Sequence, residues 1–470
     1  MADCSLTDGP LSPARLASLP ADIARPGYDR DAVRTGILHL GPGAFHRAHQ
    51  AAFTEDCLAA GETAWGILGA SLRSAGTRDA LAPQDFLYTL ALREGGREAL
   101  RVVGALRGIL AGADAPRAVL AALDDPAIRI VTLTITERGY GCDVARGELD
   151  EGDADVAHDL AAPDAAPRSV PGLLAASLWR RRRAGIAPFT LLSCDNLAGN
   201  GRVLHAAVTR MAARRDRGFG DFVAAEVACP SSMVDRIVPA TTAEDRARIA
   251  ARLGCADAAP VVGEPFAEWV IEDRFPTGRP GWERAGARFV TDVAPHERRK
   301  LRLLNGAHTM LATIGPGLGC ATVAEGVAHE RLSPVLARFW AEMAATLPAE
   351  TDAAAYCARL RARFGNTALR HELAQIALGS AQKLPQRILL PCLERWRAGR
   401  ASPVLIAVIA AWLRGAAAGG DPLDGLARRE VFAADEWRAP PLRGMIAEEC
   451  GAMARQGLAA RLDALCRAPD

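Results

Sequence analysis

The sequence lacks the features that mark nucleic-acid-binding and membrane-spanning proteins. Lysine and arginine number 56 against 55 aspartates and glutamates, so there is no basic excess to attract a polyphosphate backbone. The longest strongly apolar run, residues 404–413, falls far short of the ~20 residues that a membrane-spanning helix needs. We read this run as a buried helix and expect neither a nucleic-acid nor a membrane partner.

The eleven cysteines show no pairing pattern and include no Cys-x-x-Cys motif. This argues against a disulfide framework and against a structural zinc site. Residues 1–5 have neither a basic start nor an apolar core, so we expect no secretory signal and a cytoplasmic location. Lysine is scarce, which we interpret as a coding bias towards arginine.

The composition that is present, 50% hydrophobic and 24% charged over 470 residues, is that of a globular protein with two or three domains. Residues 1–34 are Pro-rich and indicate an irregular arm. Short apolar runs then alternate with helical patterns, which predicts an α/β domain with a parallel sheet and crossover helices. The expected strands lie at 37–40, 65–70, 128–136 and 189–193, and the expected helices at 48–60 and 173–183.

From residue 295 the pattern changes to successive helices, expected at 296–313, 330–346, 352–364, 368–380, 403–416 and 442–466. We therefore predict an arm at 1–34, an α/β domain at 35–292 and a mostly α-helical domain at 293–470.

Gly41-Pro42-Gly43 follows the first expected strand and precedes a helix. Glycines there let backbone N–H groups approach a pyrophosphate, although a plain strand-to-helix turn explains the motif equally well. His46 occupies the place of the third glycine of the usual fingerprint. The second strand ends in Ser71-Leu72-Arg73-Ser74, without the carboxylate that holds the ribose of NAD. Arg73 either favours a 2′-phosphate or is simply solvated.

His46 and His49 lie three residues apart, but no third ligand is near them in the sequence, so we expect no metal. The four arginines 180–183 end a helix, where cations complement the helix dipole, and we expect them to be solvated.

Residues 297–308 form the most informative segment. At ~100° per residue, Asn305 and His308 lie about 140° and 80° round a helix from Lys300, so all three share one side. Leucines 301, 303 and 304 imply that this helix is packed, and a lysine that loses hydration reaches its neutral form more easily, as a general base requires. The alternative is an ammonium group that extends to solvent.

The chain resembles the polyol-specific long-chain dehydrogenases, the mannitol dehydrogenase and fructuronate reductase family, from about residue 35 to 415. The resemblance is carried by six segments in order: Gly41–Gln50, Thr134–Tyr140, Ser193–Leu197, Met233–Ile237, Glu264–Phe266 with Trp269, and Lys300–His308. It implies a Rossmann-like N-terminal domain, a helical C-terminal domain and an active site in the cleft.

The resemblance also implies a metal-independent NAD(P) dehydrogenase. Lys300 would be the catalytic acid/base, Asn196 and Asn305 would flank the reacting oxygen, and His308 would contact substrate hydroxyls. Asp235 falls near the site, and Glu297 would gate proton exit. The residues assigned to the cofactor are Gly41, Gly43, Ala44, Phe45, Arg73 and Glu137, with NAD preferred to NADP.

His371, Gln375 and the segment Lys383–Arg387 are more similar to the fructuronate reductases than to the mannitol 2-dehydrogenases. Lys383 and Arg387 would pair with the carboxylate of a sugar acid such as mannonate or fructuronate, or else cap helices. Gly379-Ser380-Ala381 replaces the family's Asp-Gly-Ser, so a neutral polyol, mannitol or arabinitol, remains the alternative substrate. A non-catalytic nucleotide-binding protein is the second alternative. We expect a monomer.

Overall fold

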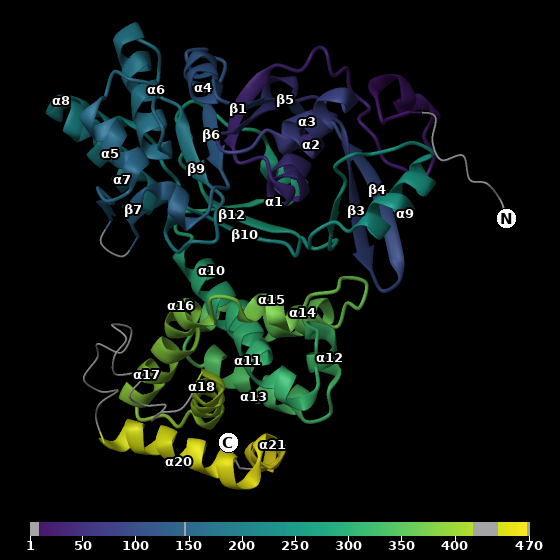
Figure 1. The fold of residues 1–470 in the computed structure, drawn as a ribbon, viewed down its shortest axis with the longest axis vertical. Coiled ribbons are helices and arrows are strands. Elements are labelled where there is room, and N and C mark those ends of the chain that lie inside the picture. The colour runs from purple at the N-terminus through teal and green to yellow at the C-terminus, as the bar shows by residue number, and fades with distance from the viewer. Residues whose placement is uncertain (1–8, 145–146, 417–439, 468–470) are drawn as a thin grey trace. The chain divides into compact units, whose positions relative to one another are not determined.

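The computed structural model describes residues 9–144, 147–416 and 440–467 (Figure 1). The chain divides into two compact units, Met1–Ala294 and Pro295–Asp470. Residues 1–8 of the expected arm lie outside the described residues. The rest of the arm is fixed to the first unit: Leu11 and Ile23 are buried, and Ala24 forms a β-bridge with Arg101. Among the helices described, none is both long and apolar enough to cross a membrane.

The first unit is built on a five-stranded parallel sheet with the strand order β5-β2-β1-β6-β9. These strands are β1 (Thr35–Leu40), β2 (Gly66–Ser71), β5 (Leu106–Ala111), β6 (Ile130–Leu133) and β9 (Thr190–Ser193). The chain moves outwards from β1 through β2 to β5, and then outwards on the other side through β6 to β9. Ligands of doubly wound folds bind at this reversal, outside the carboxyl ends of the strands. The predicted α/β class and parallel sheet are confirmed.

Side chains of successive strand residues enter cores on opposite faces of the sheet. Ile37 and Ile130 belong to one core, and Leu38 and Val131 to the other. Both faces are therefore covered, as parallel sheets require. The main helices of this unit are α1 (Ala44–Ala48), α2 (Gln50–Ala59), α3 (Gly76–Leu81), α4 (Ala115–Leu123), α5 (Ala154–Ala161), α6 (Val170–Ala184), α7 (Asn200–Arg215), α8 (Arg217–Glu226) and α9 (Ala243–Leu253). Figure 1 shows α4 to α7 gathered beside β6 and β9.

Three smaller sheets were not predicted. The strands β3 (Tyr88–Glu94) and β4 (Arg97–Val103) form an antiparallel hairpin that β11 (Val261–Gly263) extends; β10 (Ser232–Asp235), β12 (Glu268–Glu272) and β13 (Arg288–Val290) form a second sheet; β7 (Cys142–Asp143) pairs with β8 (Glu148–Leu149). Gly95 and Gly96 turn the hairpin with φ values of 54° and 80°. A Gly-Gly pair between apolar runs is the sequence signal for such a hairpin.

The second unit is helical, as predicted. Its helices are α10 (Ala294–Arg299), α11 (Gly306–Ile314), α12 (Val323–Ala328), α13 (Leu332–Ala344), α14 (Ala353–Phe364), α15 (Leu373–Ala377), α16 (Ser380–Leu384), α17 (Leu390–Arg397), α18 (Pro403–Ala416), α20 (Pro440–Gln456) and α21 (Leu458–Arg467). The apolar run at 404–413 is buried within α18, as expected.

The prediction of a single helix at 368–380 was wrong. Helix α15 ends at Ala377 because Leu378 is extended and Gly379 adopts a left-handed conformation with φ 66°. A new helix, α16, then begins at Ser380. Two five-to-six-residue π-helical turns, η6 (Lys300–Asn305) and η9 (Pro385–Leu389), pack against each other in this unit.

Candidate active site

The glycine turn after β1 has the geometry of a phosphate-binding loop. A Cβ on Gly41, whose φ is 90°, would lie 2.2 Å from the carbonyl oxygen of Thr134, so this position requires glycine. A Cβ on Gly43 would meet nothing closer than 3.9 Å, so the space in front of it is open. Helix α1 begins at Ala44, and no side chain caps the N–H groups of its first residues, Ala44 and Phe45. These features fit the diphosphate of a dinucleotide approaching the backbone.

The end of β2 offers a cation but no carboxylate. Arg73 is exposed. The hydroxyls of Ser71 and Ser74 accept hydrogen bonds from the backbone N–H groups of Ser74 and Gly76 respectively. The turn therefore contains no acidic acceptor for ribose hydroxyls, and both interpretations of Arg73 stay open.

The histidines near the glycine turn are packed. His46 stacks on His39 with ring centroids 3.4 Å apart, and burial lowers the pKa of His39 to about 3 and that of His46 far below its usual value. Nε2 of His49 lies 3.0 Å from the carbonyl oxygen of Glu268. Within residues 9–144, 147–416 and 440–467, no group of three or more His, Cys, Asp or Glu side chains is arranged to hold a metal ion.

The remaining predicted residues of the first unit lie at or just beyond strand ends. Asn196 is exposed and lies three residues beyond the end of β9. Asp235 is the buried last residue of β10, and Glu137 is exposed in the turn after β6. Asn196 and Glu137 thus follow the carboxyl ends of neighbouring strands of the parallel sheet.

In the second unit, Lys300 and Asn305 bound the π-helical turn η6. The N–H of Gly306 donates to the carbonyl oxygen of Leu301, five residues earlier. In a π-helical turn each backbone hydrogen bond spans five residues, so Asn305 lies about one turn above Lys300. The predicted angle of 140° between the two side chains, which assumed an α-helix, was therefore wrong. Lys300, Asn305 and His308 are only 7%, 8% and 7% exposed, and Glu297 is half-buried one turn earlier. Lys300 is therefore not in bulk solvent.

His308 is held among aromatic rings and cations. Its ring stacks on Phe364 at 4.5 Å and meets His371 edge-on at 4.8 Å. Burial, and then the charges of His371, Arg387, Arg363 and Lys300, lower its pKa well below the usual value. The imidazole is neutral at pH 7. Nε2 of His308 and Nδ1 of His371 are both buried without a partner in the described part of the chain.

Arg387 and Lys383 lie beside this group. The Arg387 guanidinium donates to the Thr309 hydroxyl at 3.2 Å and, weakly, to the carbonyl of Asn305 at 3.4 Å, and burial lowers its pKa to about 10. The Lys383 ammonium donates to the carbonyl of Leu378 at 2.6 Å and caps the end of α15. Burial, and then Arg387, lower its pKa. No carboxylate of the described residues forms an ion pair with either cation.

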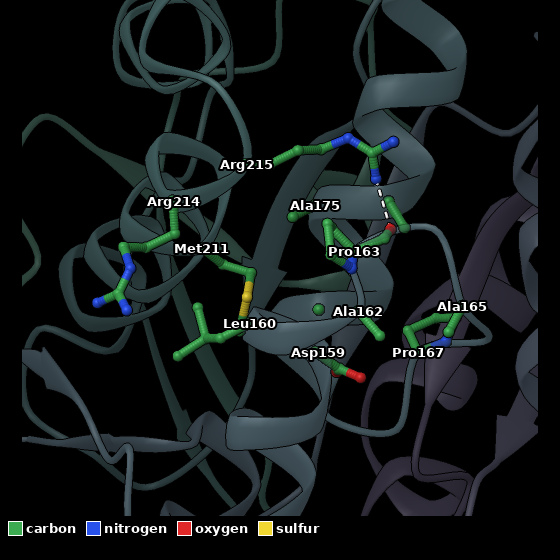
Figure 2. Close-up of a pocket in the computed structure, with 12 residues that line it drawn as sticks. Asp159, Leu160, Ala162, Pro163, Ala165, Pro167, Ala175, Met211, Arg214 and Arg215 are labelled. Atoms are coloured by element: carbon green, nitrogen blue, oxygen red, sulfur yellow. Dashed lines mark hydrogen bonds between the residues drawn. The ribbon is translucent and has the colours of Figure 1, made fainter.

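A cavity of about 410 Å³ lies in the helical unit and is bordered by Thr309, Lys383, Ser380 and Ala381. Ser380 and Ala381 belong to the segment Gly379–Ala381, so this segment forms part of the wall. A second pocket, between α5, α6 and α7, encloses only about 20 Å³. Figure 2 shows that the Arg214 guanidinium points away from it. A space of that size holds one water at most.

Two further signals for this unit are present in the sequence. Thr309, which binds Arg387, lies four residues after Asn305 on the same helix, a spacing that indicates a shared face. Lys300 and Lys383 are the two lysines of the whole chain. In a sequence that otherwise uses arginine, positions that keep an amine are candidates for chemistry that arginine cannot perform.

Comparison with known proteins gives a consistent result. Residues 35–284 match the mannitol dehydrogenase Rossmann domain and residues 292–420 the mannitol dehydrogenase C-terminal domain. The chain is 40% identical over 399 residues to the D-mannonate oxidoreductase of Escherichia coli (83% of this chain, 82% of that one), and 39% identical over 400 residues to the mannitol 2-dehydrogenase of Cereibacter sphaeroides (83% of each).

Among solved structures, the fold is similar to that of Pseudomonas fluorescens mannitol 2-dehydrogenase in a ternary complex with NAD and D-mannitol. The TM-score is 0.87, with 33% identity over 98% of this chain and 100% of that one. A substrate-free D-sorbitol dehydrogenase gives a TM-score of 0.86, with 32% identity over 96% of this chain and 100% of that one. The chain therefore belongs to the mannitol dehydrogenase family and is an oxidoreductase that acts on CH–OH groups.

Proposed function

We propose that the protein interconverts a secondary alcohol and a ketone of a sugar acid, D-mannonate and D-fructuronate, with NAD. The observation that carries the proposal is the π-helical turn that buries Lys300 together with Asn305 and His308. An amine removed from bulk water gives up its proton more easily than a solvated one. This is the property that a general base for an alcohol requires.

Each residue has an assigned step. Neutral Lys300 accepts the hydroxyl proton as the alcohol is oxidised, and the ammonium form returns it to the oxygen in the reduction. The amides of Asn196 and Asn305 donate hydrogen bonds to the oxygen as it gains negative charge. His308, neutral and with a free Nε2, binds a neighbouring substrate hydroxyl. Bound nicotinamide supplies the hydride acceptor. Glu297, Asp235 and His371 are supporting residues of the site.

The charge around His308 supports an acidic substrate. Arg387 and Lys383 are partly or largely buried, and no described carboxylate neutralises them. An unpaired buried cation is costly, and a bound carboxylate removes that cost through charge-assisted hydrogen bonds. Lys383 also borders the cavity of about 410 Å³, whose volume is sufficient for a six-carbon chain, although the lining includes none of Lys300, Asn305 and His308.

A neutral polyol is the second candidate, because Lys383 already donates to two backbone carbonyls and so has partners without a substrate carboxylate. The similarity to a mannitol 2-dehydrogenase solved with D-mannitol supports it too. For the cofactor we propose NAD at Gly41, Gly43, Ala44, Phe45 and Glu137, and Arg73 is the reason to test NADP. Cytoplasmic location and a monomeric state remain predictions.

Absorbance at the reduced-nicotinamide wavelength tests the proposal with fructuronate, tagaturonate, fructose, mannitol and arabinitol, each with both cofactors. We expect the largest kcat/KM with fructuronate and NADH. In Lys300→Ala, loss of the proton acceptor should lower kcat by about 10³-fold. Lys300→Arg should do no better, because a guanidinium does not release its proton near neutral pH.

NADH binding, followed by its fluorescence, is the control and should change less than about twofold in both variants, since Lys300 is assigned to the substrate. Normal turnover in Lys300→Ala would refute the assignment. A wild-type protein that binds NADH but turns over none of the five compounds would favour the non-catalytic alternative.

A further inference from the structure

The turn after β6 contains a strained residue. Thr136 has φ 66° and ψ 164°, a region of backbone conformation that is essentially restricted to glycine. Among the described residues, the other non-glycine positions with positive φ are Asp85, Phe86 and Asp352, and none of these is β-branched. A β-branched residue is especially disfavoured there. Surrounding contacts must therefore hold Thr136 in place.

The carboxylate of Asp195 supplies those contacts. Its Oδ1 accepts the N–H of Thr136 at 2.9 Å, and its Oδ2 accepts the N–H of Ile135 at 3.1 Å. The Tyr140 hydroxyl donates to the same Oδ2 at 2.9 Å. Both oxygens are thus committed to the turn of residues 135–140. These bonds also end β6 at Leu133, because the N–H groups that would continue the strand are directed to Asp195 instead.

Asp195 is itself fixed from the other side. The amide of Asn200 donates to the Asp195 carbonyl at 2.9 Å and to the carbonyl of Ser232, in β10, at 2.7 Å. Asn196, which the proposed function assigns to the reacting oxygen, is the next residue. Any movement of Asp195 moves the backbone that carries the Asn196 amide.

The strained turn also contacts the glycine turn. The Thr134 hydroxyl donates to the carbonyl of Gly41 at 2.8 Å. Hydrogen bonds therefore connect the ends of three adjacent parallel strands: β9 through Asp195, β6 through residues 134–136, and β1 through Gly41. This is the edge at which a dinucleotide binds in such sheets.

We infer that Asp195 is a positioning residue: its carboxylate holds Thr136 in a glycine-type conformation and so fixes the spacing between Asn196 and the glycine turn that takes the cofactor. The inference rests on the proposed function for the role of Asn196 and for the cofactor. It adds a residue whose side chain acts through the backbone of a neighbouring turn.

The test pairs Asp195→Asn with Thr136→Gly. In Asp195→Asn an NH₂ group replaces one acceptor oxygen, so the side chain holds one of the two backbone N–H groups instead of both, and the turn around Thr136 is less firmly fixed. We expect the Kd for NADH, measured by fluorescence, to rise about tenfold, the scale set by the strain released. Thr136→Gly alone should bind NADH with the Kd of the wild type. Added to Asp195→Asn, it should reverse most of the rise in Kd, because glycine adopts this conformation without strain. A merely structural role for Asp195 would give no such recovery.

Two further measurements complete the design. Hydrogen exchange of the segment 134–140 without cofactor should be slow in the wild type and fast in Asp195→Asn. Asp159→Asn is the matched control, since the Asp159 carboxylate also accepts two backbone N–H groups, from Arg168 and Ser169. It should lower thermal stability and leave the Kd unchanged.

An unchanged Kd in Asp195→Asn, or a loss that Thr136→Gly does not recover, would overturn the inference. If the wild type bound no NADH, the proposed function would fail separately. Hydrogen exchange would then decide whether Asp195 holds the turn, and equal exchange in the two proteins would overturn it.

Discussion

Arginine and lysine are used differently in this chain. The side chain of Arg181, expected to be solvated, is 2% exposed and donates to the carbonyls of four residues between 123 and 187. A guanidinium has enough donors to satisfy several carbonyls at once, which explains the burial. Lysine is confined to positions 300 and 383. An amine can lose its proton and a guanidinium cannot, which fits the proton transfer that we propose for Lys300.

Arg387→Gln tests whether the cation selects an acidic substrate. The variant keeps a hydrogen-bond donor for Thr309 but loses the charge. We expect KM for fructuronate to rise by about 10- to 100-fold, the value of a charged hydrogen bond, with little change in KM for fructose. Arg359→Gln, an exposed arginine of the same unit, is the control and should change neither constant. Equal effects on the two substrates would contradict an acid-binding role.

The sequence proposes Lys300, Asn305 and His308 as site residues because all three lie in one short motif; the structure buries all three, and their roles stay predictions. The sequence could not predict how the backbone presents them. The predicted arrangement of their side chains was calculated for an α-helix, whereas residues Lys300–Asn305 form a π-helical turn. The partners of Arg387 and the bonds of Asp195 depend on contacts between distant segments, which no local pattern encodes.

At the scale of elements, apolar runs located β1, β2, β6 and β9 of the central sheet, because a strand buried on both faces is apolar throughout. The fifth strand of that sheet, β5, was not predicted. The strand expected at 128–136 stops at Leu133, and the reason is tertiary: residues 135 and 136 are held by Asp195. The helix expected at 368–380 is broken at Gly379, since apolar spacing continues through a residue whose backbone is left-handed. The predicted ends of helices and strands were wrong where a tertiary contact or a left-handed glycine interrupted the local pattern.

The π-helical turn η6 is held by an indole from another helix. The N–H of Trp340, in α13, donates to the carbonyl of Leu303 at 2.9 Å. Trp340→Phe keeps an aromatic ring but removes this bond. We expect the free energy of unfolding to fall by about 1 kcal/mol for the lost bond, with some further loss from the smaller ring. We also expect kcat to fall several-fold, because Lys300 and Asn305 bound the turn.

Trp396→Phe is the matched control for this experiment. Trp396 packs against the same hydrophobic core, and its side chain makes no hydrogen bond within the described residues. It should lower stability without affecting kcat. A Trp340→Phe enzyme with wild-type kcat would show that the turn does not need the indole.

On the scale of the whole molecule, each unit has its own extensive core, and each core contains neutral histidines. His39 and His46 are fully buried in the first unit, and His308 is buried in the second. Burial is the main cause of the low pKa in all three. Such groups make the folded chain sensitive to acid in a direction that the net charge of +1 does not reveal.

The sign follows from proton binding. Below pH 6.5 the unfolded chain protonates these histidines, whereas folded His39 stays neutral down to a pKa of about 3. The unfolded state then binds more protons, so stability falls as the pH drops from about 6.5 towards 3, by about 1.4 kcal/mol per pH unit for His39. Between pH 6.5 and pH 5, the neutral state of buried His39 alone should lower the free energy of unfolding by about 2 kcal/mol.

Urea unfolding at pH 7 and pH 5 measures this decrease. His39→Gln should lose about 2 kcal/mol less than the wild type over that interval. An equal loss in His39→Gln and the wild type would mean that His39 does not resist protonation in the folded protein, and the neutral stack with His46 would have to be abandoned.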